Sequence, residues 1–502
     1  MTDSTTTRLT PTEAVARPRL LPVVIPSIAF VMVSLDALVV VTAMPSIHGD
    51  LGGRPAALQW LITGYNLTFA AGIITAAALG DRFGRLRVFL AGLALFTAAS
   101  AACAVAPDLS LLIGFRALQG LGAAVVTPLG LTLVTAAFPA ERRGAVVGIW
   151  GGIAGLGIAA GPLVGGAVTE GLDWHWVFWV NVPIGLLAIL GSRRVLTERR
   201  GPARPLDVPG MLLAGIGVAV LVWALVQAPD AGWGTGRTLG ALATGAALVA
   251  AFLGWEARTR APMIPLGLFR RAQFSAAALA NLLMVGAVFA AAYLTSQFFQ
   301  IARGDGPLDA GLHMLAWTAT PLVVAPLAGR LFDRVGARVL AVPGLLAQAV
   351  GFLWIAVLAG TQASWGAYVA PLVIAGVGVS LALPALPAAT LNAVPPQALG
   401  QASGVVNTLQ RFGAVLAVAV ATAVFDASGA LTSPATDGYR PAMLVAAAFS
   451  GVGAVVALRA AGRPSRAQRR PHDRTARDRR AHRRGHGQRG LPQLPTTLEE
   501  LS

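Results

Sequence analysis

The sequence predicts an all-α integral membrane protein with fourteen transmembrane helices in two similar halves. Hydrophobic residues make up 55% of its 502 residues and charged residues only 12%, too few to cover the surface of a soluble protein of this length. The hydrophobic residues gather in runs of about 20, the length that an α-helix needs to cross a bilayer. One short motif occurs in both halves of the chain, which indicates an internal repeat.

Fourteen apolar runs meet this length requirement. They lie at 21–47, 59–80, 88–106, 109–138, 143–169, 176–192, 207–228, 238–256, 273–300, 308–331, 339–360, 364–392, 402–425 and 441–460. Because the repeated motif follows the second run and the tenth, we expect six helices, an inserted pair and six more. The predicted parts are a cytoplasmic N-terminal tail (1–20), an N-terminal six-helix bundle (21–192), a linker with two extra helices (193–272), a C-terminal six-helix bundle (273–460) and a disordered, arginine-rich cytoplasmic tail (461–502).

The placement of arginines predicts that both ends of the chain face the cytoplasm. All 38 basic residues are arginines, and positive charges concentrate in cytoplasmic loops. With a cytoplasmic N-terminus, the outer loops hold only Arg54, Arg237, Arg303 and Arg440, and the other loop arginines fall on the inner side. For the basic tail, attraction to the anionic inner leaflet is a simpler expectation than nucleic-acid binding.

Asp36 stands in the middle of the first apolar run. A charge at this depth costs roughly 2.5–3.5 kcal/mol on insertion scales, so it calls for an explanation. One explanation is structural, a buried acid that pairs with a neighbour to hold helices together. The other is functional: burial disfavours the charged form of a carboxyl group, so Asp36 could gain and lose a proton in transport. Arg116, at a similar depth in the fourth run, is the expected partner.

Other polar residues lie deep in the apolar runs. Gln119 and Thr127 share a helical face with Arg116, and Asn407 shares one with Arg411. Such residues can line a substrate cavity, although many only form hydrogen bonds across helices. The candidates for the cavity wall are Tyr65, Asn66, Gln119, Thr127, Asn281, Tyr293, Gln297, Asn407 and Arg411.

The repeated motif is read as a pair of conformational latches in short inner loops. Its first copy is "AALGDRFGRLR" (77–87) and its second is "GRLFDRVGARV" (329–339). In each copy a glycine allows a tight turn, and the aspartate can bond to a nearby arginine or to a helix N-terminus. The latch residues are Asp81, Arg82, Gly84, Arg85, Asp333, Arg334 and Gly336.

The fifth run is a ladder of glycines at four-residue spacing. Gly144, Gly148 and Gly152 form one set, and Gly157, Gly161 and Gly165 form the next. This spacing aligns the glycines on one side of a helix, where a neighbouring backbone can approach closely. Pro162 favours a bend in the same helix.

Seven motifs together resemble the major facilitator superfamily, specifically its branch of fourteen-helix drug:proton antiporters. The resemblance covers nearly the whole chain from the first run to the last. The motifs are "LDALVVVTAMP" (35–45), "LQWLITGYNL" (58–67), "ALGDRFGRLR" (78–87), "RALQGLGAA" (116–124), "GIAAGPLVGG" (157–166), "WHWVFWVNVPIG" (174–185) and "QASGVVNTLQRFG" (401–413). The chain departs from the family pattern at Ala77, where glycine is usual, and at His175, where arginine is usual.

The resemblance implies roles for several of these residues. The arginine of the fourth-helix motif, Arg116 here, would assist proton transfer to and from Asp36. The fifth-helix motif is associated with antiporters, and the matching residues are Gly157, Gly161, Pro162, Gly165 and Gly166.

The function predicted from these features is proton-coupled efflux of lipophilic small molecules such as drugs or antibiotics. We expect no enzymatic activity, no metal site, no cofactor other than the coupling protons and no nucleic-acid partner. The chain is expected to be a multi-pass protein of a bacterial plasma membrane. We expect it to be a monomer that contacts membrane lipids. Without lysine it cannot carry the P-loop of an ATP-driven pump. The alternatives are a proton- or sodium-coupled symporter of an organic solute and a non-transporting scaffold or sensor.

Overall fold

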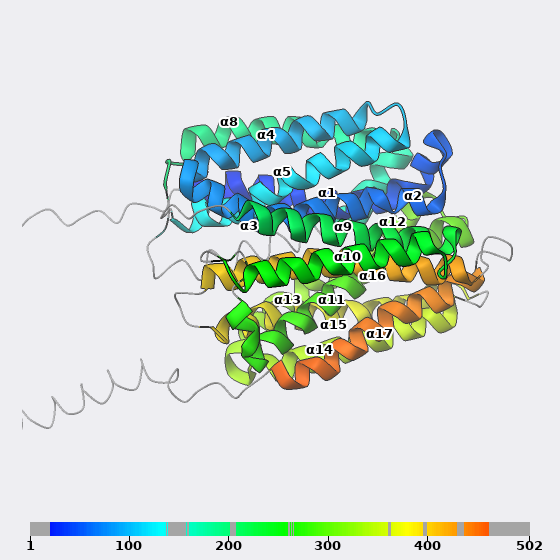
Figure 1. Ribbon diagram of the computed structural model, residues 1–502. Coiled ribbons are helices and arrows are strands. Elements are labelled where there is room, and N and C mark those ends of the chain that lie inside the picture. Colours follow the sequence, from blue (N-terminus) through cyan, green and yellow to red (C-terminus); the bar gives the residue numbers. More distant parts are fainter. Residues whose placement is uncertain are drawn as a thin grey trace, which may run out of the picture. The chain divides into compact units, whose positions relative to one another are not determined.

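The computed structural model describes residues 21–136, 138, 157, 160–200, 207–259, 262, 264, 266–359, 363–394, 399–428 and 436–460. The regular elements in these ranges are all helical (Figure 1). Twelve of the described helices are long and apolar enough to cross a membrane, and the chain is a multi-pass membrane protein. The N-terminal tail, the first glycine set and the C-terminal tail lie outside the described residues.

The first half of the chain contains six predicted spans. Its described helices are α1 (Leu21–Leu51), α2 (Pro55–Leu58), α3 (Trp60–Phe83), α4 (Arg85–Ala104), α5 (Leu109–Ala136), a helix over 160–171, α7 (Trp176–Trp179) and α8 (Asn181–Val195). α3, with 24 residues, is not among the twelve, and the predicted span at 143–169 is described only in part. The count of fourteen and the cytoplasmic termini therefore stay predictions.

The inserted pair and the second half follow. The elements are α9 (Val208–Ala231), α10 (Gly236–Glu256), η2 (Leu266–Arg270), α11 (Ala272–Gln297), η3 (Phe298–Ala302), α12 (Pro307–Thr318), α13 (Thr320–Val335), α14 (Ala337–Leu358), α15 (Trp365–Asn392), α16 (Leu399–Ala427) and α17 (Thr436–Ala460). The predicted span at 308–331 is thus divided between α12 and α13, on either side of Ala319.

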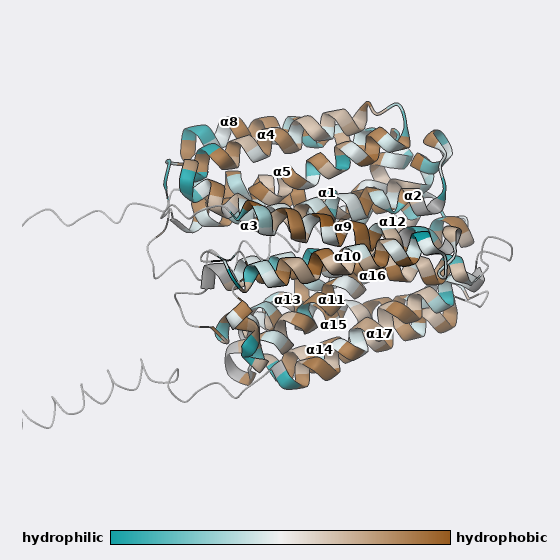
Figure 2. Cartoon of the chain, in the orientation of Figure 1, coloured by the Kyte–Doolittle hydropathy of each residue, from teal (hydrophilic) through white to brown (hydrophobic). Residues whose placement is uncertain are grey.

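Hydropathy follows the predicted pattern along each helix. Brown, hydrophobic residues occupy the helix middles, and teal residues gather toward their ends and connections (Figure 2). Large apolar side chains such as Leu187, Val323 and Val455 are more than 60% exposed. Such exposure suits a surface that faces lipid hydrocarbon and would be costly in water.

Helix contacts join the two halves along a seam. α3 of the first half packs against α16 of the second, and α9 of the inserted pair touches both. α1 also contacts α11 and α12. The two helices that carry the strongest polar candidates, α1 and α16, therefore both lie where the halves meet.

The second glycine set confirms the predicted close approach, and the neighbour is α1. A Cβ atom on Gly157 would lie 2.7 Å from the Cβ of Ser34, and one on Gly161 would lie 2.9 Å from the Cβ of Leu38. The adjoining Gly166 packs against the backbone of Pro307 at the start of α12. Gly157, Gly161 and Gly165 thus contact α1, and Gly166 contacts the second half.

Candidate functional site

Asp36 and Arg116 form a buried ion pair between α1 and α5. Arg116 Nη1 donates to Asp36 Oδ2 at 2.5 Å, and both side chains have no exposed surface. This contact confirms the partner that depth in the apolar runs predicted. Because the opposite charges compensate each other, the pair avoids much of the cost of an isolated charge in a low-dielectric interior.

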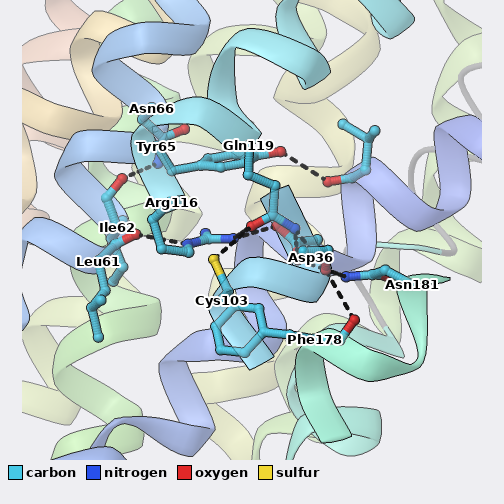
Figure 3. A network of polar contacts seen from close by, with 12 residues as sticks. Asp36, Leu61, Ile62, Tyr65, Asn66, Cys103, Arg116, Gln119, Phe178 and Asn181 are labelled. Carbon is cyan, nitrogen blue, oxygen red and sulfur yellow. Dashed lines mark hydrogen bonds and ion pairs between the residues drawn. The ribbon is translucent and has the colours of Figure 1, made fainter. Parts of the chain in front are cut away.

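Two amides complete the surroundings of the Asp36 carboxylate. Gln119 Nε2 and Asn181 Nδ2 each donate to its Oδ1 at 2.9 Å. Both amides also donate to Ser100 Oγ, which itself donates to the Phe178 carbonyl at 2.9 Å. Figure 3 shows Gln119 and Asn181 converging on Asp36 from separate helices. Three donors bond to this carboxylate, which suits its ionised, acceptor-only form.

The Arg116 guanidinium is fixed by more than its ion pair. Its Nε donates to the Leu61 carbonyl at 3.1 Å, and its Nη1 also donates to Gln119 Oε1 at 2.7 Å. The centre of the guanidinium lies 4.3 Å from the centroid of the Tyr65 ring, a cation–π distance. Arg116 is therefore held by α3 as well as by α1.

Glycines of α5 allow this close assembly. A Cβ atom on Gly122 would lie 2.6 Å from the backbone nitrogen of Phe96 in α4, and Gly120 packs directly on the Tyr65 backbone in α3. With only hydrogen at these positions, α5 can approach both neighbours closely enough for Arg116 and Gln119 to reach Asp36.

Arg411, on α16, reaches across the seam to α3. Its Nη1 donates to Asn66 Oδ1 at 3.3 Å, and its guanidinium centre lies 4.0 Å from the centroid of the Phe69 ring. Tyr65 and Phe69 are one helical turn apart and meet edge to face at 6.0 Å. The two aromatic rings of α3 thus lie between the two arginines.

The remaining cavity candidates fall into other surroundings. Asn281 is fully buried on α11, where its Oδ1 accepts from Gln410 Nε2 at 3.3 Å. Asn407 donates to the Ser403 carbonyl of its own helix. Gln297 Nε2 lies 3.7 Å from Met44 Sδ, at the contact between α11 and α1.

Neither Tyr293 nor Thr127 joins the Asp36 network in the described part of the chain. Tyr293 is buried on α11. The Thr127 hydroxyl is buried on α5 and has no hydrogen-bond partner among the described residues.

An apolar groove of about 460 Å³ lies beside the network. Its walls come from α1, from Val164 in the helix over 160–171, and from residues 180–184. Asn181, which donates to Asp36, is one of only two polar residues in its lining. The groove therefore places an apolar surface next to Asn181, one of the donors to Asp36.

In the first copy of the repeated motif, the loop is also bonded by Glu198, a residue that the sequence analysis did not single out. Asp81 pairs with Arg85 at 2.8 Å, as the motif predicts, and Gly84 adopts a positive φ of 109° between α3 and α4. The Glu198 carboxylate accepts from the backbone nitrogens of Leu86 and Arg87, both at 3.0 Å. It thereby satisfies unpaired donors in the first turn of α4.

Less of the second latch is described. Gly336 has a φ of 84° between α13 and α14 and supplies the predicted turn. The side chains of Asp333 and Arg334 lie outside the described residues. Arg82 in the first latch places its guanidinium 5.3 Å from the Phe83 ring centroid and forms no ion pair with a described residue.

Asn181, Ser100 and Glu198 are the functional candidates that sequence reasoning missed. Asn181 and Ser100 are single polar residues in long apolar runs, a signal they share with many residues that only bond to their own helix.

No set of three or more His, Cys, Asp or Glu side chains in the described ranges could hold a metal ion.

Comparisons with known proteins agree with this architecture. The sequence profile of the Major Facilitator Superfamily matches residues 27–417 and 277–488. A relative from Mycobacterium tuberculosis, "Multidrug resistance protein Stp", is 35% identical over 413 residues, 82% of this chain and 76% of the relative. The "Tetracenomycin C resistance and export protein" of Streptomyces glaucescens is 34% identical over 396 residues, 78% of this chain and 73% of the relative.

Solved structures share the fold at low sequence identity. An auto-inhibited peptide transporter of the POT family superposes with a TM-score of 0.66 at 17% identity, over 88% of this chain and 97% of that one. The xylose transporter XylE from E. coli, in a partially occluded inward-open conformation, gives a TM-score of 0.58 at 15% identity, over 87% and 96%.

Proposed function

The chain belongs to the major facilitator superfamily and is a transporter rather than an enzyme, and from this premise we propose that it exports lipophilic small molecules in exchange for protons. The protein would act in the plasma membrane of a bacterium. Relatives named for resistance to, or export of, antibiotics support export. The observation that carries proton coupling is the Asp36 carboxylate, fully buried and held by Arg116, Gln119 and Asn181.

Protonation of Asp36 would change the forces on several helices at once. A neutral carboxyl group no longer compensates Arg116, and leaving a buried charge without its partner costs about 3–5 kcal/mol. The network would therefore rearrange around Arg116 when the proton arrives. Because its members come from α1, α4, α5 and α8, this rearrangement would act on the packing of the first half.

α1 is the element through which this change would reach the second half. It carries Asp36, packs against Gly157, Gly161 and Gly165, and contacts α11 and α12. On α11 the Ser296 hydroxyl donates to the Val41 carbonyl of α1 at 3.4 Å. A shift of α1 on protonation would alter contacts between the halves, as alternating access requires.

A second group of contacts joins the helix over 160–171 to α12, from the middle of α1 toward its C-terminal end. Glu170 Oε2 accepts from the Leu308 backbone nitrogen at 2.9 Å, and a Cβ atom on Gly311 would lie 2.5 Å from the Pro162 carbonyl oxygen. By the arginine distribution this end of the helices faces outward. We infer that these contacts must open for substrate to leave.

Uptake by inside-out vesicles tests export and its energy source together. Vesicles that contain the protein are energised with a proton gradient and given puromycin, tetracenomycin C or methylenomycin A, compounds named in the descriptions of its relatives. We expect accumulation of at least one compound and its loss when a protonophore collapses the gradient. Accumulation that survives the protonophore would contradict proton coupling, and accumulation of none would contradict export of this class of compounds.

A further inference from the structure

Arg411 is a deeply placed cation with no acidic partner among the described residues. It lies in α16 roughly 13 Å from the start of the membrane-spanning segment at Ala402. Among the described residues no carboxylate lies within ion-pair distance of it. Its contacts with the described residues are one long hydrogen bond to Asn66 and a cation–π contact with the face of the Phe69 ring. A guanidinium has five N–H donors, so these contacts leave most of its capacity unused.

A polar group beside Arg411 also has unused capacity. Thr408 lies one turn earlier on the same face of α16, and its buried hydroxyl has no hydrogen-bond partner among the described residues. A neutral group that can donate a hydrogen bond thus accompanies the cation on this face of the helix.

Charge distinguishes this region from the Asp36 network. Asp36 has no exposed surface and is compensated by Arg116, so its carboxylate is not open to a positively charged molecule. Arg411 is partly exposed at the seam between the halves. The charge available to a ligand is therefore positive.

We propose that Arg411 binds an acidic group of the exported molecule, with Thr408 as a further donor. The inference rests on the proposed export function and names its substrate class: lipophilic molecules with a carboxylate, sulfonate or phenolate. The guanidinium supplies charge-assisted hydrogen bonds to the anion. The fully buried Phe69 ring lies against the guanidinium and helps to hold it in place.

The position of α3 gives this site a route to the proton site. Leu61 and Tyr65 of α3 contact Arg116, whereas Asn66 and Phe69 of the same helix contact Arg411. An anion at Arg411 and a proton on Asp36 attract rather than repel each other. Competition between charges therefore cannot make the substrate and the proton move in opposite directions. We attribute the exchange to a rearrangement of α3 between binding of the substrate and binding of the proton.

Equilibrium binding to a matched pair of dyes tests the proposal. Anilinonaphthalene sulfonate and phenylnaphthylamine share an apolar body and differ by the sulfonate group. The full chain in lipid nanodiscs is titrated with each dye, and protein-free nanodiscs give the background. We expect the wild type to bind the sulfonate dye about tenfold or more tightly than Arg411→Gln does, the scale of a hydrogen bond to a charged group, with no change for the neutral dye.

Two further variants make the result specific. Arg411→Lys keeps the charge and should retain part of the preference for the sulfonate dye. Arg440→Gln removes an exposed arginine and should bind both dyes as the wild type does. No binding of the sulfonate dye by the wild type, or equal binding by the wild type and Arg411→Gln, would overturn the proposal. Because the titration uses no proton gradient, its failure would leave proton-coupled export standing.

Discussion

Arg116 and Arg411 both lie deep in membrane-spanning helices, yet their surroundings differ. Arg116 is fully buried, pairs with Asp36 and also bonds to Leu61 and Gln119. Arg411 is partly exposed at the seam and has no ion pair with a described residue. A charge that is paired with a buried carboxylate can respond to one proton, whereas a partly exposed charge can bind a ligand. The comparison thus separates the energy-coupling end of the proposed site from its substrate end.

The largest expected difference is in stability. Arg116→Met leaves Asp36 buried without its partner, which should cost about 3–5 kcal/mol. Arg411→Met removes a cation that no described acid compensates, so it should lower stability by about 1 kcal/mol or less, the scale of its cation–π contact. Thermal unfolding of the purified variants in detergent measures both. Equal losses would mean that Arg411 is also paired.

A double variant serves as the control for Arg116. Replacing Asp36 by Asn together with Arg116→Met removes both charges and should recover part of the lost stability. The double variant should nevertheless fail to couple transport to protons. No recovery would indicate that Arg116 stabilises the fold mainly by packing.

The next effect comes from the close contact between α1 and the helix over 160–171. Gly165→Val places a branched side chain against the Val39 carbonyl oxygen, which lies 2.5 Å from the position of a Cβ atom. Overpacking of this kind costs about 1–3 kcal/mol, and transport should be lost because α1 carries Asp36. Gly171→Ala at the end of the same helix meets nothing within 4 Å and should transport as the wild type does in vesicle uptake.

An effect of similar size is expected from the amide that the sequence analysis missed. Asn181→Leu removes one of the donors to the Asp36 carboxylate, and a lost hydrogen bond to a charged group costs about 1.5–3 kcal/mol. The midpoint of thermal unfolding should fall by less than for Arg116→Met. Asn181→Gln keeps the amide donor and tests whether its distance from Asp36 matters. An Asn181→Leu variant as stable as the wild type would contradict a part for Asn181 in the network.

The smallest effect sharpens the description of Arg411. Phe69→Leu keeps an apolar side chain but removes the ring under the guanidinium, a contact worth about 0.5–1 kcal/mol or somewhat more when desolvated. Binding of anilinonaphthalene sulfonate should weaken only severalfold, far less than in Arg411→Gln. A loss as large as that of Arg411→Gln would show that the ring, and not the charge, determines binding.

The pairing of Asp36 with Arg116 could be predicted because two opposite charges at similar depth are rare and costly in apolar helices. The rest of the network could not, because Asn181 and Ser100 look in the sequence like many polar residues that bond to their own helix. The contact of Arg411 with Asn66 joins residues 345 apart in the chain, and only the packing of α16 on α3 brings them together. The spacing of Gly157, Gly161 and Gly165 predicted a close neighbour without identifying α1.

Proton release from inside-out vesicles tests the central claim most directly. Vesicles with a proton gradient, acidic inside, contain either the wild type or Asp36→Asn, and a transported compound is then added while the gradient is recorded. The account predicts that the compound triggers proton release from wild-type vesicles and that Asp36→Asn abolishes it, while unfolding confirms that the variant is folded. Release that persists in Asp36→Asn would contradict the account and would leave Asp36 as a charge that only pairs helices.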